Sequence, residues 1–221
     1  MAVAAEPPSL LLHTVENLAD FHREHERFYA AAPREQAVVL QRHGGTLHEV
    51  ADRAAAELDG VLFLEGQGEP AGLAALRREV RTFGEESVAT GEWMAKAMQS
   101  SWTAAGGILD IAALDDLLGE RHRIIATDWQ AAGVTVVVGR LLERAADVLD
   151  RVDAEATAGA RTPRLLRSAA ELIARAADLL GESAGLVQDN ERRWRLFHER
   201  VSALLAVQPA ATDPPPAVDA S

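Results

Sequence analysis

Three histidines and a glutamate near the N-terminus are the residues of this sequence best suited to binding a metal ion. His22 and His25 are one helical turn apart and share a face, and Glu26 follows His22 by four residues. If the chain reverses direction near residue 32, His43 comes level with His22. Three imidazoles and a carboxylate in this arrangement suit zinc or iron.

Two features of the same region favour a structural interpretation instead. Neither the Glu-x-x-His pair of ferritin-like di-iron bundles nor a His-Glu-x-x-His motif occurs in the chain. His43 flanks the apolar stripe of its predicted helix, beside the Gly44–Gly45 pair. We therefore predict a solvated helical hairpin without a cofactor, and keep a zinc or iron site as the alternative.

A second candidate site lies on the core stripes of three long predicted helices. Reflecting each helix onto the next, about turns near residues 109 and 159, places Thr90, Asp128 and Asn190 at one level. Each helix also carries a tryptophan within about one turn of this level: Trp93, Trp129 and Trp194. The pattern predicts a carboxylate in the core, which is costly unless it is hydrogen-bonded.

This polar layer has two interpretations. A buried polar layer fixes the alignment of long helices whose Ala- and Leu-rich stripes would otherwise slip by a heptad. Aromatic walls around a few convergent polar groups are also typical of a small-molecule pocket. The first interpretation is structural and the second makes the layer a ligand-binding site.

Composition excludes several classes of function. The chain has 221 residues, with 22 basic and 34 acidic side chains and a net charge of −12. Without a basic run, there is no electrostatic footprint for nucleic acid or an anionic membrane surface. The absence of cysteine excludes disulfides and thiolate chemistry. No nucleophile elbow and no phosphate-binding glycine loop occurs, which favours a protein that is not an enzyme.

The spacing of apolar residues and the positions of Gly and Pro predict an all-α fold. The expected helices cover about residues 9–31, 33–58, 70–105, 113–155 and 163–207. We expect an elongated antiparallel bundle of about five helices, in which a hairpin over residues 9–58 joins three long helices over 70–207. Residues 59–69 form the connector, 9–207 a single domain, and 1–8 and 208–221 disordered tails.

These patterns predict a helical-bundle protein that acts by binding another protein or a second copy of itself, for example as a homodimer. A ligand-binding bundle and a histidine-based metalloprotein are the two alternatives. No signal peptide and no apolar stretch of membrane-spanning length is visible, so we expect a cytoplasmic protein. The preference for Arg over Lys and the high Ala content indicate a bacterial, GC-rich coding sequence.

Overall fold

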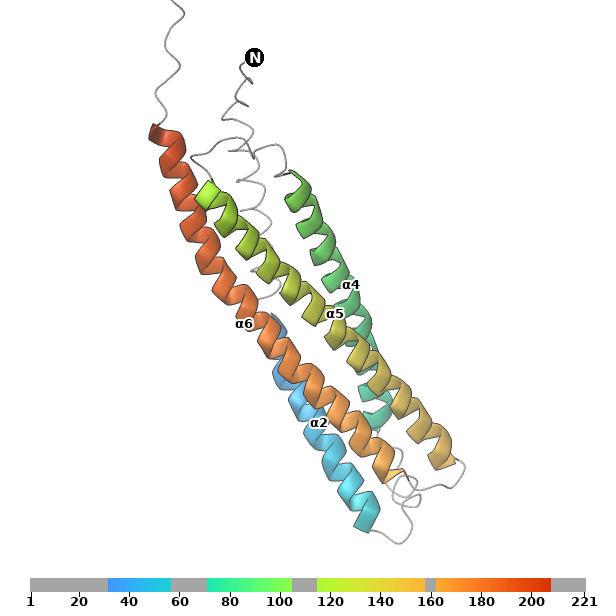
Figure 1. Ribbon diagram of the computed structural model, residues 1–221. Helices are drawn as coiled ribbons and strands as arrows, with labels where there is room; N and C mark the ends of the chain where they lie inside the picture. The colour runs from blue at the N-terminus through green and yellow to red at the C-terminus, as the bar shows by residue number, and fades with distance from the viewer. Residues whose placement is uncertain (1–31, 57–70, 105–114, 158–161, 208–221) are drawn as a thin grey trace, which may run out of the picture.

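The computed structural model describes residues 32–56, 71–104, 115–157 and 162–207 (Figure 1). These residues form four helices: α2 (Ala32–Ala56), α4 (Ala71–Ala104), α5 (Asp115–Thr157) and α6 (Pro163–Val207). The described part of the chain contains no strand, which confirms the predicted all-α class. The predicted first helix, the connector and both tails lie outside the described residues.

Local sequence explains where the helices begin. Pro163 is the first residue of α6, where its missing N–H costs nothing because that position has no intrahelical acceptor. The carbonyl of Thr162 accepts the bond that opens the helix, from the N–H of Leu166 at 3.0 Å. Asp116 stands in the first turn of α5, where a carboxylate interacts favourably with the helix dipole. All four helices start and end within about two residues of the predicted bounds.

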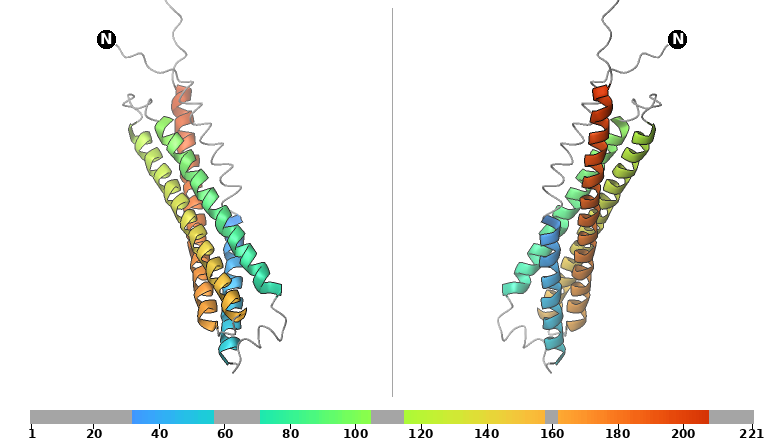
Figure 2. Two further views of the ribbon diagram at one scale, coloured as in Figure 1. Left: turned by 90° about the vertical axis from the view of Figure 1, so that its right-hand side faces the viewer. Right: turned by 90° about the vertical axis from the view of Figure 1, so that its left-hand side faces the viewer.

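The described helices form two layers (Figure 2). The pair α5·α6 is one layer, and α4 and α2 both lie on the same side of it. Neighbouring helices run in opposite directions: Asp52 of α2 pairs with Arg167 of α6, whereas Arg34 pairs with Gln188. Arg77 of α4 likewise pairs with Asp153, near the end of α5.

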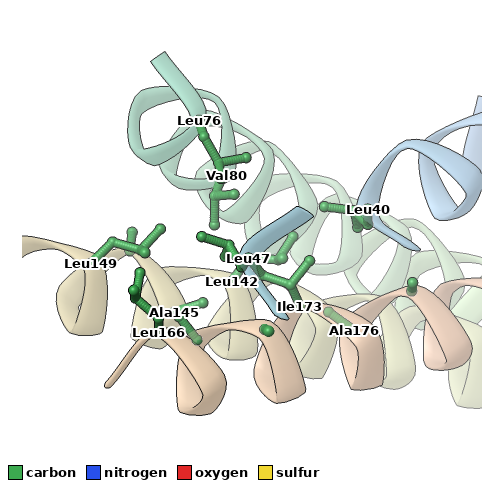
Figure 3. Close-up of a cluster of buried hydrophobic side chains, with 14 of the residues drawn as sticks. Leu40, Leu47, Leu76, Val80, Leu142, Ala145, Leu149, Leu166, Ile173 and Ala176 are labelled. Atoms are coloured by element: carbon green, nitrogen blue, oxygen red, sulfur yellow. The ribbon is translucent and has the colours of Figure 1, made fainter. Parts of the chain in front are cut away.

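An apolar core joins all four helices at one end of the molecule (Figure 3). Its largest buried side chains include Leu40 and Leu47 of α2, Val80 of α4, Leu142 and Leu149 of α5, and Leu166 and Ile173 of α6. Fully burying a leucine-sized side chain contributes about 1.5–3 kcal/mol, so this cluster is the main source of stability in the described part. The predicted core stripes of α5 and α6 are buried along their described length.

Glycines allow α4 and α5 to approach closely. A Cβ at Gly139 would lie 2.6 Å from the carbonyl oxygen of Gly84, and a Cβ at Gly91 would lie 2.7 Å from that of Ala132. Both distances are too short for a side chain, so the two backbones are in contact. Gly44 does the same for α2, because a Cβ there would lie 3.3 Å from the carbonyl oxygen of Ala170 on α6.

None of the described helices is both long and apolar enough to cross a membrane.

Candidate functional site

The predicted polar layer contains a buried carboxylate that is hydrogen-bonded across the α5·α6 interface. Asp128 is fully buried, and its Oδ1 accepts a hydrogen bond from Asn190 Nδ2 at 2.9 Å. Its Oδ2 accepts one from Trp194 Nε1 at 3.2 Å. The second proton of Asn190 Nδ2 goes to the carbonyl of Ile124 at 2.7 Å. The predicted alignment of Asp128 with Asn190 is therefore confirmed.

A second polar contact lies seven residues along each helix. Thr135 and Ser183 are both buried, and their hydroxyl oxygens are 3.1 Å apart. Each lies within hydrogen-bond distance of the carbonyl oxygen of Ala131, at 2.9 Å for Thr135 and 3.1 Å for Ser183. The repeat of seven places both contacts on the same α5·α6 seam, and a slip of one helix along the other, by seven residues or by any other step, would separate these polar pairs.

The α4 member of the predicted layer lies at a different level. Trp129 donates to the carbonyl of Ala95 at 3.1 Å, and Gly91 packs against Ala132. The α4 residues level with Asp128 are therefore near Met98, about two turns beyond Thr90. The prediction for Thr90 was wrong because it assumed a symmetric turn, whereas the glycine contacts set the offset between α4 and α5.

The three tryptophans do not surround one buried group. Trp194 is 6% exposed and meets Phe197 edge-on, with ring centroids 5.5 Å apart. Trp93 is 47% exposed and Trp129 37%, so both lie largely at the surface. Of the predicted aromatic wall, only Trp194 contacts the buried carboxylate through a described hydrogen bond.

Two buried polar groups near this seam are relevant to its chemistry. Asn190 Oδ1 is buried and accepts no hydrogen bond from the described residues. Arg121 is also buried, and desolvation by burial lowers the pKa of its guanidinium to about 10. Asn190 Oδ1 is the atom at which a small hydrogen-bond donor could be held.

The predicted metal ligands fall mostly outside the described residues. His22, His25 and Glu26 lie there, and only His43 is described. It is half-buried, and its Nε2 lies 3.3 Å from Glu79 Oε2 of α4, at an angle that does not give a hydrogen bond. Within the four described helices, no three His, Asp or Glu side chains gather as a metal site would require.

A third feature, absent from the sequence-based predictions, is the side of the α5·α6 pair that faces away from α2 and α4. Two rows of half-buried aliphatic residues run along it at seven-residue spacing: Val134, Leu141 and Val148 on α5, and Leu165, Leu172, Leu179 and Leu186 on α6. The residues that contact α4 and α2 lie on the opposite sides of these two helices: Ala132, Val136 and Gly139 on α5, and Arg167, Ala170 and Ala174 on α6.

We call this surface the outer face and define it by four rows in steps of seven residues. The two central rows are every seventh residue from 120 to 155 on α5 and from 165 to 200 on α6. The two rim rows are every seventh residue from 116 to 151 on α5 and from 168 to 196 on α6. The rim rows carry two of the large exposed hydrophobic side chains of the described chain, Val137 at 49% and Leu196 at 52% exposed. In Figure 1, α5 and α6 run in front of α2 and α4 where the helices cross.

A signal for the outer face was present in the sequence. Beside the core stripe of α6 runs a second strict heptad of leucines, at a position where a surface helix normally carries charge. A helix with one apolar stripe needs one neighbour, whereas a wider stripe indicates packing partners on two sides.

Comparisons with family models, curated proteins and solved structures give no match, so the function has to be argued from this geometry.

Proposed function

We propose that this protein is a non-enzymatic helical bundle that acts by binding another protein or by self-association. The observation that supports this most directly is the outer face, with its two aliphatic rows and the exposed Val137 and Leu196. Contiguous apolar surfaces of this kind mark interaction sites on soluble proteins. The proposal includes the expected architecture, an elongated antiparallel bundle of about five helices within a single domain over residues 9–207, located in the cytoplasm.

The physical reason is that the leucines of the outer face, although they pack on the core, keep apolar surface that a partner can still cover. Burial of apolar surface contributes about 25 cal/mol per Å², so each partly exposed leucine of α6 retains stabilisation that only a partner can supply. The buried seam, by contrast, already satisfies most of its polar groups within the chain, since Asp128 of α5 accepts hydrogen bonds from Asn190 and Trp194 of α6. The outer face therefore has more to gain from binding than the seam has.

Site-specific photo-crosslinking in the producing cells tests this function. We would place a benzophenone amino acid at Val137 and, as a control, at Val38 of α2, which is similarly exposed at 55%. We expect a discrete protein adduct from position 137 and none from position 38. No adduct from position 137, or the same adducts from both positions, would contradict the proposed function.

A small-molecule-binding bundle is the second candidate, supported by the buried Asn190 Oδ1 that accepts no described hydrogen bond. Such an atom is costly unless a donor satisfies it. Native mass spectrometry of untagged protein, with metal analysis of the same sample, tests this candidate and the zinc or iron alternative together. A bound mass that Asn190→Leu removes would support the small molecule, and a bare polypeptide mass would argue against both.

A further inference from the structure

We propose that the outer face is an interface with a second copy of this chain, packed face to face about a twofold axis. This inference rests on the proposed function and names its partner. It is argued from the size of the face, from its charge and from the arrangement of its rows.

The first argument is area. The leucine row from Leu165 to Leu186 extends over 21 residues, which corresponds to about 31 Å along a helix. Two adjacent helices are about 20 Å wide, so the face covers roughly 600 Å² per copy. A face-to-face dimer would then bury roughly 1,200 Å² in total, at the lower end of the range for specific interfaces. From an area of this size we expect a weak, reversible dimer.

The second argument is charge. The four rows of the outer face carry six arginines and five acidic residues. The whole chain has a net charge of −12, and none of that excess lies on this face. Because these charges nearly balance, two copies of this acidic protein can meet through the outer face without a strong repulsion between like charges.

The third argument is the match of the two surfaces. A twofold axis makes an interface isologous, so that each copy presents the same patch to the other. The aliphatic rows of one copy then meet rows of identical length and composition, and the four helices α5, α6 and their symmetry mates form a bundle of their own. The exposed Val137 and Leu196 lie on the rim rows, where they would contact the second copy.

Sedimentation velocity on the full chain, from about 1 to 100 µM, tests the inference directly. We expect a monomer–dimer equilibrium for the natural sequence. Val137→Glu and Leu196→Glu should each weaken the dimer by at least about tenfold, because each would remove an apolar contact and require a carboxylate to lose its water on association. Both side chains are about half exposed, so these variants should keep the helical content and melting temperature of the parent.

Val38→Glu is the matched control, because it adds the same charge at a similarly exposed valine of α2, in the other layer. It should change the dimer constant by less than about twofold. Raising the salt concentration should strengthen the dimer, since screening reduces the repulsion between two chains of net charge −12.

Two results would overturn the second copy as partner. One is a monomer throughout the concentration range, and the other is a dimer that Val137→Glu and Leu196→Glu leave unchanged. A monomeric chain that still crosslinks from position 137 to a different protein would overturn this inference while supporting the proposed function. Loss of the crosslink itself would count against the proposed function.

Discussion

Two regions of the α5·α6 pair use the same heptad repeat differently: the buried seam between the two helices and the outer face that points away from α2 and α4. The inner seam combines small residues with hydrogen-bonded polar pairs, Asp128 with Asn190 and Thr135 with Ser183, and it is covered. The outer face repeats leucine every seven residues and is left half-exposed. The comparison teaches that the seam specifies which residues of the two helices lie opposite each other, while the outer face provides apolar surface without specifying an internal partner.

Two adjacent leucines of α6 give the largest expected contrast between these faces. Leu180 is 3% exposed in the core, and Leu179 lies on the outer face. We expect Leu180→Ala to destabilise the monomer by about 3–4 kcal/mol, since it leaves a cavity. Leu179→Ala should cost about 1 kcal/mol at concentrations below dimerisation. Urea unfolding measures both, and equal costs would show that the two faces are equally buried.

Removing the buried carboxylate should have the next largest effect. Asp128→Ala leaves the Trp194 indole N–H and one proton of the Asn190 amide without their acceptor. We expect a loss of roughly 2–3 kcal/mol. Asp128→Leu combined with Asn190→Leu should recover part of this stability, because the carboxylate and the amide are replaced together while the Trp194 N–H still lacks its acceptor. If Asp128→Ala were neutral in urea unfolding, the seam would have no role in stability.

The same substitution, Gly→Ala, at two positions of α5 compares the side that contacts α4 with a side that is open to solvent. Gly139→Ala should destabilise by about 1–2 kcal/mol, because its Cβ would lie 2.6 Å from the Gly84 carbonyl oxygen. Gly133 has nothing within 4 Å of the corresponding position, so Gly133→Ala should stabilise by about 0.5–1 kcal/mol. Thermal unfolding followed by circular dichroism measures the sign, and the same sign for both would contradict the close contact of α4 with α5.

The smallest expected effect comes from the ion pairs between α4 and α5. Arg81 contacts Asp150 at 2.6 Å and Asp147 at 3.4 Å, at the surface. We expect Arg81→Ala to cost at most about 1 kcal/mol, and less in high salt. Arg78, for which no ion pair is described, is the control. A loss that persists at 1 M salt would show that Arg81 contributes through packing rather than charge.

Helix existence and the α5–α6 register could be predicted from the sequence because both depend on local periodicity. Asp128, Thr135, Ser183 and Asn190 lie on heptad positions, and the short connection before Pro163 makes reflection accurate. The same method failed for Thr90, because residues 105–114 separate α4 from α5 and leave the offset to packing. The contacts of Gly84, Gly91 and Gly139 fix the offset between α4 and α5. A glycine in a helical sequence does not indicate which residue it will contact, so this offset could not be predicted.

The sequence by itself determined the helices, their core stripes and the polar pairs that align α5 with α6, since a period near 3.5 residues and a costly buried carboxylate have few solutions. Only the tertiary structure decided which second stripe the four described helices leave partly exposed. Whether the leucine row of α6 is buried depends on where α2 and α4 pack, and both lie on the other side. The exposure of a side chain depends on how the helices pack together, and for this reason the sequence alone could not identify the leucine row as a candidate interface.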